Sequence, residues 1–324
     1  MTDSISFGPI PSRRLGRSLG VNNIPPKACS YSCLYCQVGP TPQREIEPRD
    51  FYPPERILAD VTSRLQAAER SGEAVDYLTF VPDGEPTLDR NLGETIRLLR
   101  PLGVKIAVIT NASLIWREDV RECLAAADWI SVKVDSVEGA VWRRINQPHP
   151  SLELSRILEG IRLFAEVYSG VLNTETMLVE GVNDDASKMA AQGEYLAQLN
   201  PARAYLAIPL RPTAEQGIRP PSEQRINAVF QALSPYLPQL ECLIGYEGNA
   251  FASTGNVAED LLSITAVHPM REEAVRALLE KTGGDWEIVI SLVEQGRLKT
   301  AEYQGRRFYM RVLPSVEEGT VNQA

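Results

Sequence analysis

Residues 104–110 read VKIAVIT, and residues 129–135 read WISVKVD. Both runs are rich in β-branched residues, which favour extended strands. Residues 117–126 between them have the length and apolar spacing of a helix. A strand, a helix and a second strand in this order predict a βαβ unit, whose two strands lie parallel in one sheet.

The same alternation continues on both sides of this unit. Further strands are predicted at residues 17–23, 76–81, 171–179, 203–209 and 240–245, and further helices at 54–70, 89–100, 151–168, 184–199 and 222–234. Pro53 with Pro54, and Pro221 with Ser222, are typical helix starts. The pattern predicts an α/β fold, a partial (β/α) barrel of about six parallel strands, with an open doubly wound sheet as the alternative. Both architectures place ligands at the carboxyl ends of the strands.

The pattern changes near residue 268. A helix is predicted at 271–282, and a second at 286–295 with Asp285 as its N-cap. Residues 299–312 form a predicted hairpin that turns at Gln304 and Gly305. Two helices followed by a hairpin predict a small winged-helix-like module. The expected division is a barrel domain at 1–250, a linker at 251–267, the module at 268–313 and a disordered tail at 314–324.

The composition is that of an ordinary globular protein with an acidic balance. The 324 residues carry a formal net charge of -9, which argues mildly against a broad nucleic-acid-binding surface. No apolar run is long enough to span a bilayer, and the N-terminus lacks the apolar core of a signal peptide. We therefore expect a cytoplasmic protein that does not act at a membrane. Cys123 and Cys242 lie in apolar patterns typical of core thiols.

The other three cysteines lie within eight residues, in the run CSYSCLYC at 29–36. Thiolates at this spacing in one loop can bind an iron–sulfur cluster through Cys29, Cys33 and Cys36. Three ligands leave one iron of a four-iron cluster open, and an open position is where a metal centre does chemistry. The alternative is a structural zinc site, which needs a fourth ligand; the local sequence offers no histidine.

The triplet, with Tyr35 directly before its third cysteine, resembles the signature of the radical S-adenosylmethionine superfamily. Residues 11–16, followed by 21–23, are similar to the branch that contains the wyosine tRNA-base synthases. The resemblance covers roughly residues 6–250. It implies a 4Fe-4S cluster on the three cysteines and S-adenosyl-L-methionine (SAM) chelated to the open iron. One-electron reduction then cleaves SAM to methionine and a 5′-deoxyadenosyl radical, which abstracts hydrogen from a substrate.

Asp83, Gly84 and Glu85 follow the strand predicted at 76–81. In the superfamily that the chain resembles, a Gly-Gly-Glu run at this position receives the amino group of SAM, and here Asp83 replaces the first glycine. Gly84 permits close backbone approach, and Glu85 offers a carboxylate to an ammonium group. The alternative is a turn rich in glycine and proline. The place after a strand favours the cofactor-binding role.

Four further polar residues are candidates for the cofactor site. Asn111 follows strand 104–110 and either reaches the cofactor or occupies a turn. Lys133 and Asp135 share one face of their strand, where they either line the cavity or form a structural ion pair. Asn183 resembles a residue used near the cofactor carboxylate, but a cap for helix 184–199 is the favoured interpretation.

Other charged residues are candidates for lining the cavity or binding an anionic substrate. Glu175 shares one face of strand 171–179 with Asn173 and Met177. Arg211 follows strand 203–209, and Arg13, Arg14 and Arg17 form a basic group before the cysteines. Each arginine has the alternative of a solvated or locally paired side chain.

Together these features predict a radical enzyme with one cluster, because grouped cysteines occur only once. Its reductant would be an electron donor such as a flavodoxin or ferredoxin. Modification of tRNA bases and activation of a glycyl-radical protein are both possible, and the acidic balance favours a protein or small molecule over nucleic acid. The alternative is a non-catalytic metal-cluster protein whose winged module binds DNA, which requires a basic recognition helix. Helix 286–295 is acidic and apolar, so we favour a protein-docking or substrate-lid role for the module.

Overall fold

The computed structural model describes residues 5–213, 215–243, 256–267 and 269–312. Its main domain is a curved sheet of eight strands, whose spatial order is their order along the chain. β1 pairs antiparallel with β2, and β2 to β8 pair parallel with one another. The strands are β1 (Ser6–Ser12), β2 (Gly16–Val21), β3 (Tyr77–Phe80), β4 (Lys105–Thr110), β5 (Trp129–Lys133), β6 (Val171–Met177), β7 (Arg203–Ala207) and β8 (Leu240–Leu243).

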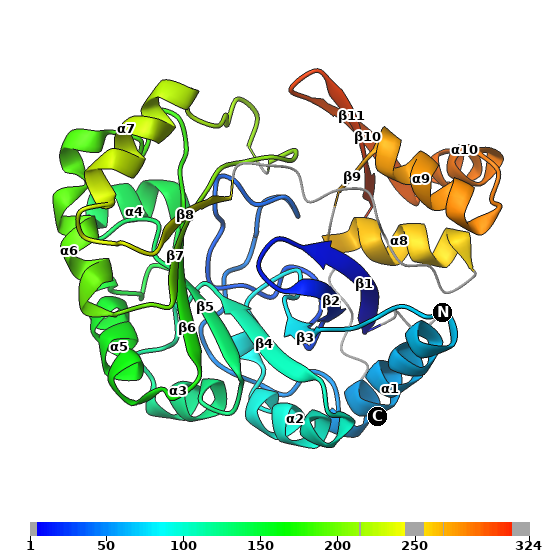
Figure 1. Cartoon of the computed structure of the whole chain (residues 1–324), viewed down its shortest axis with the longest axis horizontal. Coiled ribbons are helices and arrows are strands. Elements are labelled where there is room, and N and C mark those ends of the chain that lie inside the picture. Colours follow the sequence, from blue (N-terminus) through cyan, green and yellow to red (C-terminus); the bar gives the residue numbers. More distant parts are fainter. Residues whose placement is uncertain (1–4, 214, 244–255, 268, 313–324) are drawn as a thin grey trace.

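Helices cover the convex side of this sheet (Figure 1). Strand alternation explains the arrangement: Ile106 and Val108 of β4 face the helices in the main core, whereas Ala107 faces the concave side. The helices between the strands are α1 (Pro54–Arg70), α2 (Leu92–Leu99), α3 (Glu118–Leu124), α4 (Gly139–Asn146), α5 (Leu154–Val167), α6 (Ala190–Gln198) and α7 (Glu223–Leu233).

The predicted partial barrel is confirmed, with seven parallel strands in place of about six. One strand and one α-helix of the barrel domain were not predicted. β1 contains Pro9 and Pro11, which lower strand propensity but are tolerated at a sheet edge, where ladder hydrogen bonds are missing on one side. α4 is only eight residues long, and the sequence prediction left its segment without an element.

The turn between β1 and β2 fills the concave side of the barrel. Leu15 in this turn is buried against Trp129, Tyr205 and Leu243. Leu243 belongs to β8, at the far edge of the sheet. Among the described residues β8 pairs only with β7. An apolar side chain, not a strand pairing, therefore bridges the open seam of the barrel.

The C-terminal part forms the predicted winged-helix-like module, with the order helix, strand, two helices and two strands. Its sheet has the order β10-β11-β9. The turn of the β10–β11 hairpin lies at Gln304 and Gly305, both with positive φ, as predicted. The elements are α8 (Val257–Val267), β9 (Met270–Arg271), α9 (Glu272–Thr282), α10 (Glu287–Glu294), β10 (Leu298–Tyr303) and β11 (Arg306–Arg311).

The prediction of a linker at 251–267 was wrong for its described part. Residues 257–267 form α8, and Leu261 and Ile264 of this helix are buried in the same core as Val275 and Leu279 of α9. Apolar residues at helical spacing bury a face that a linker would leave in solvent. The module therefore begins with α8. The tail predicted at 314–324 lies outside the described residues.

The module is docked on the barrel domain beside β1 and α1 (Figure 1). Ile10 of β1 packs against the module's core. The Tyr303 hydroxyl of the wing donates to the carbonyl oxygen of Pro209, in the loop after β7, at 3.0 Å. Arg64 of α1 lies 3.7 Å from the Asp260 carboxylate of α8. The wing thus contacts a loop at the carboxyl end of the barrel.

Candidate iron–sulfur cluster site

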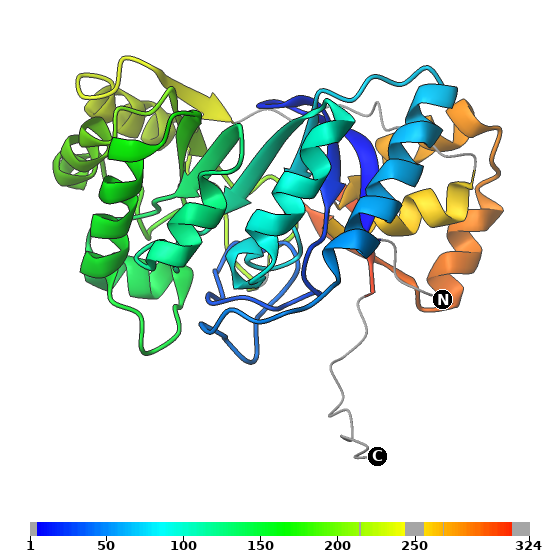
Figure 2. The same ribbon diagram turned by 90° about the horizontal axis from the view of Figure 1, so that it is seen from below.

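The long segment between β2 and α1 lies at one edge of the sheet, where the strands end (Figure 2). Within it, Cys29, Cys33 and Cys36 line one pocket of about 310 Å³. Residues at the strand ends line the same pocket, among them Asp83, Gly84, Asn111, Lys133 and Glu175. The structure therefore brings the cysteine triplet and most of the predicted polar residues together.

Helix α4 anchors the loop that carries the cysteines. The backbone N–H of Ser32 donates to the carbonyl of Asn146 at 3.1 Å, and that of Leu34 donates to the carbonyl of Ile145 at 2.9 Å. The last carbonyls of a helix have no partner within it, so these bonds satisfy the helix end and hold the loop. Sequence reasoning missed α4, although the buried spacing of Trp142, Ile145 and Asn146 is helical.

The three cysteine thiols fit the ligand set of a four-iron cluster, because cluster irons are held by cysteine sulfur. In the part of the chain that the structure describes, no three Cys, His, Asp or Glu side chains converge on one ion position. In a four-iron cluster each thiolate binds a different iron, so the ligands stand farther apart. Burial raises the pKa of Cys29 and that of Cys33, the latter to about 12. Such thiols keep their protons until a bound metal centre displaces them.

Asp83 and Gly84 lie against the cysteine loop. A Cβ on Gly84 would stand 2.0 Å from the carbonyl oxygen of Ala28, so only glycine fits. Hydrogen bonds from Lys27 N–H to Asp83 O (2.8 Å) and from Glu85 N–H to Ala28 O (2.9 Å) join the two segments. Burial raises the pKa of Asp83 to about 7, although the positive charges of Lys27 and Arg311 oppose the rise.

Glu85 is buried among hydrogen-bond donors and is not among the residues that line the pocket, so a contact of its carboxylate with the cofactor ammonium stays a prediction. Its carboxylate accepts hydrogen bonds from Thr87 N–H (3.0 Å), Thr87 hydroxyl (2.6 Å), Thr110 hydroxyl (2.6 Å) and Asn111 N–H (2.7 Å). A short turn that starts at Pro86 directs the side chain inward. Glu85 therefore holds the ends of β3 and β4 together and positions Asn111.

Asn111 faces the pocket and the first cysteine. Its side-chain amide donates to Ser30 Oγ at 3.0 Å and lies 3.6 Å from Cys29 Sγ. Its Oδ1 accepts the Ser113 N–H at 2.9 Å, which fixes the orientation of the amide. Asn111 follows β4 as predicted. Its side chain starts a turn through the Ser113 N–H and also lines the cavity, whereas its contact with the cofactor stays a prediction.

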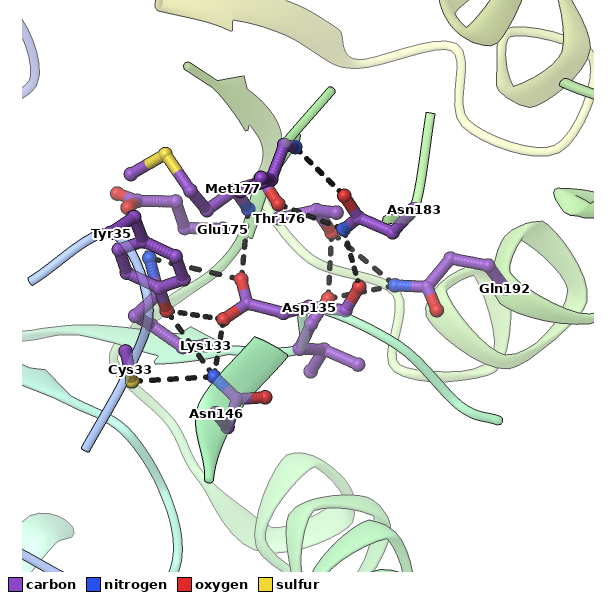
Figure 3. A network of polar contacts seen from close by, with 12 residues as sticks. Cys33, Tyr35, Lys133, Asp135, Asn146, Glu175, Thr176, Met177, Asn183 and Gln192 are labelled. Atoms are coloured by element: carbon purple, nitrogen blue, oxygen red, sulfur yellow. Dashed lines mark hydrogen bonds and ion pairs between the residues drawn. The ribbon is translucent and has the colours of Figure 1, made fainter. Parts of the chain in front are cut away.

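Lys133 and Asp135 belong to a buried polar network (Figure 3). Lys133 Nζ lies 2.8 Å from Glu175 Oε1 and 3.8 Å from Asp135 Oδ1, and Arg14 forms an ion pair with the other oxygen of Glu175. Burial would raise the pKa of Glu175, but Lys133 and Arg14 lower it to about 2. Burial would lower the pKa of Lys133, but its two carboxylate neighbours raise it. The structural ion pair is thus present, and Lys133 also lines the pocket.

Asp135 itself turns toward the cysteine loop. Its carboxylate accepts hydrogen bonds from the Tyr35 hydroxyl, from Asn146 Nδ2 (2.7 Å) and from Met177 N–H (2.8 Å). Asn146 Nδ2 also lies 3.4 Å from Cys33 Sγ. The aromatic residue of the motif therefore ties the third-cysteine segment to strand β5. Sequence reasoning missed the roles of Asn146 and of the Tyr35 hydroxyl.

Asn183 stabilises a loop and does not line the pocket of the three cysteines. Its Oδ1 accepts the Val179 N–H at 2.8 Å, and its Nδ2 donates to the carbonyls of Asp135 (2.9 Å) and Met177 (2.8 Å). It does not cap a helix, since α6 begins only at Ala190. The cap interpretation of Asn183 was therefore wrong, because the segment after residue 183 forms a loop and a short 3₁₀ turn before α6. Its contact with the cofactor carboxylate stays a prediction.

Among the described residues, no helix combines the length and the apolar character needed to cross a bilayer.

Comparisons with known proteins agree with this site. The model of the Radical SAM superfamily matches residues 23–192. The UPF0026 protein MJ1312 of Methanocaldococcus jannaschii is 45% identical over 321 residues, which cover 98% of this chain and 99% of that protein. The probable GTP 3′,8-cyclase of Pyrococcus horikoshii is 27% identical over 161 residues, 49% of this chain and 46% of that protein.

Solved structures support the fold. TYW1 with a lysine–pyruvate adduct bound matches with a TM-score of 0.51 and 20% identity, over 68% of this chain and 73% of that one. The predicted resemblance to the wyosine synthases is thereby confirmed at the level of the fold. Since the family model covers more than half of the sequence, this chain belongs to the radical SAM superfamily.

Proposed function

We propose that this enzyme binds a 4Fe-4S cluster on Cys29, Cys33 and Cys36 and uses it to cleave SAM reductively. The observation that carries the proposal is the shared pocket: three half-buried cysteines and the polar ends of β3 to β6 surround one cavity. A purely structural metal site needs no such cavity, whereas a cofactor that must be bound and shielded from water does. When bound, the cluster and SAM would supply a 5′-deoxyadenosyl radical for hydrogen abstraction.

The chain's own residues would bind and orient the cofactor. Asp83, Gly84 and Asn111 are the proposed contacts of SAM beside the cluster, because they line the pocket next to the cysteines. Glu85 acts indirectly, through its hydrogen bond to the Asn111 backbone. Lys133 is a cation of the buried network that lines the cavity, and it forms an ion pair with Asp135, which does not line the cavity.

The substrate is proposed to be a small molecule or a protein, and the reductant a flavodoxin or ferredoxin. The wing contact at Pro209 lies on a residue that lines the pocket. Arg311 of β11 is close enough to oppose the pKa rise of Asp83. These two contacts support a role for the module as a fixed wall of the entrance, where a substrate would pass.

The alternative role, a DNA-binding regulator, has less support. Residues 257–313 contain eight lysines and arginines and nine aspartates and glutamates. The helix in the recognition position, α10, exposes Ile290 and Val293 between Glu287 and Glu294. In the wing, Arg307 lies 3.1 Å from Glu302, and Arg306 lies 3.5 Å from Glu273. Phosphate binding needs a surplus of positive charge, which this surface lacks.

The test is anaerobic reconstitution with iron and sulfide, followed by reduction and addition of SAM. We expect about four irons per chain, an EPR signal on reduction, and accumulation of 5′-deoxyadenosine. Cys36→Ala should lose the cluster and the product. Cys242→Ala, which removes a half-buried thiol of β8 that does not line the pocket, is the matched control and should keep both. A verified four-iron preparation that forms no 5′-deoxyadenosine would overturn the proposal.

A further inference from the structure

Two asparagine amides point at two of the three cluster sulfurs. Asn146 Nδ2 lies 3.4 Å from Cys33 Sγ, and Asn111 Nδ2 lies 3.6 Å from Cys29 Sγ. Both distances are within the range for N–H···S hydrogen bonds. The two asparagines come from different parts of the fold, one from the end of α4 and one from the end of β4.

Each amide is held in a single orientation by its other contacts. Asn146 is 3% exposed, and its Nδ2 donates to the Asp135 carboxylate at 2.7 Å. A carboxylate accepts only, so the NH₂ group and not the oxygen must face this side. At Asn111 the oxygen accepts the Ser113 N–H, which leaves the NH₂ group facing Ser30 and Cys29. The donors are thus preset before any cluster binds.

Two further contacts fix the orientation of the Asp135 carboxylate. Its other carboxylate oxygen accepts the Met177 N–H at 2.8 Å and lies 3.8 Å from Lys133 Nζ. The carboxylate is completely shielded from solvent, so it cannot swing away to water. A chain of contacts therefore runs from the β5–β6 charge network through Asp135 to the Asn146 amide and the Cys33 sulfur (Figure 3).

Hydrogen bonds to the sulfurs are one of the main determinants of a cluster's reduction potential. Reduction adds one electron, and part of its charge resides on the sulfurs. An N–H donor stabilises this added charge more than it stabilises the oxidised cluster, so donors raise the potential. We propose that Asn146, oriented by Asp135, and Asn111 set the reduction potential of the cluster. This inference rests on the proposed cluster, and it makes Asp135 the positioning residue of Asn146.

The test is a redox titration of the reconstituted holoenzyme with a one-electron reductant, followed by EPR of the reduced cluster. Asn146→Leu keeps the approximate volume but removes the donor. At the wild-type midpoint the ratio of reduced to oxidised cluster should fall roughly tenfold, equal to a shift of about 59 mV for one electron. Asn111→Leu should shift in the same direction by less, because its N···S distance is longer.

Asn183→Leu is the matched control. Asn183 is also buried and also contacts Asp135, but through the backbone carbonyl, and its side-chain hydrogen bonds go to backbone groups and not to a sulfur. Its midpoint should stay at the wild-type value. Equal shifts of the midpoint potential in Asn146→Leu and Asn183→Leu would mean that any disturbance of the polar network changes the potential. That result would overturn the inference.

A second measurement requires no substitution. In wild-type protein labelled with ¹⁵N in asparagine side chains, the reduced cluster should show a ¹⁵N hyperfine coupling and exchangeable deuterons in D₂O. A correctly loaded cluster without either signal would overturn this inference alone. Failure of the wild-type chain to assemble a four-iron cluster would overturn the proposed function together with it.

Discussion

The Glu85 carboxylate accepts the backbone N–H of Asn111 at 2.7 Å, across the ends of two neighbouring strands. The same carboxylate accepts the Thr110 hydroxyl at 2.6 Å. One buried side chain thereby fixes the turn after β3 to the turn after β4. Both turns line the pocket, so the relative position of the proposed cofactor contacts depends on Glu85.

Replacing Glu85 should therefore destabilise the fold as well as the site. Glu85→Ala leaves donors of Thr87, Thr110 and Asn111 without an acceptor in a buried place. Each unsatisfied group costs about 1–3 kcal/mol, so we expect a loss of about 3 kcal/mol in the free energy of unfolding. Glu94→Ala, on the exposed side of α2, is the control and should change it by less than about 0.5 kcal/mol. Denaturant unfolding measures both, and equal stability of the two variants would refute this role.

Gly84 offers a steric test of the contact between the β3 turn and the cysteine loop. Gly84→Ala would place a methyl group 2.0 Å from the Ala28 carbonyl oxygen, so the two segments must separate. We expect a loss of about 2 kcal/mol or more and reduced iron incorporation. Gly139→Ala meets only the flexible end of Arg143 at 3.5 Å and should be neutral or slightly stabilising. Iron content after reconstitution that is equal in both variants would contradict the steric argument.

The sequence predicted those parts of the fold whose signal is local. The βαβ rhythm, the Ser222 cap of α7 and the cysteine triplet each depend on residues close together in the chain. β1 was missed because its two prolines mask a strand that only its edge position permits. α8 was missed because its burial depends on partners in α9.

The site shows the same division between local and long-range information. Glu85 was placed at the correct strand end, but its partners Thr110 and Asn111 lie 25 and 26 residues away. Asn146 meets Cys33 across 113 residues. A short window of sequence contains no information on such long-range contacts. The sequence therefore predicted which residues lie at the strand ends, but not the direction in which their side chains point.

The pH dependence of stability should report on Asp83. Burial raises the pKa of Asp83 to about 7, against about 3.9 in an unfolded chain. Between these values the folded state binds more protons than the unfolded state, so stability falls as the pH rises from about 4 to about 7. The full effect is at most about 4 kcal/mol. We expect Asp83→Asn to flatten this part of the profile, and a wild-type profile that rises over the same window would show that Asp83 is ionised in the fold.

The buried charge network should show coupling between Lys133 and Glu175. Lys133→Met leaves two carboxylates, Glu175 and Asp135, with Arg14 as the remaining cation of the network. Breaking one member of a buried pair costs about 3–5 kcal/mol, whereas Lys299→Met at an exposed site of β10 should cost less than about 0.5 kcal/mol.

The double variant Lys133→Met/Glu175→Gln restores equal numbers of positive and negative charges, because Arg14 and Asp135 remain. We expect it to be more stable than Lys133→Met alone, with a coupling energy of about 1–3 kcal/mol from denaturant unfolding of all four proteins in the cycle. Additive losses would mean that Lys133 and Glu175 contribute independently. In that case the low pKa of Glu175 would come from Arg14 and Arg13, and Arg14→Gln would raise it more than Lys133→Met.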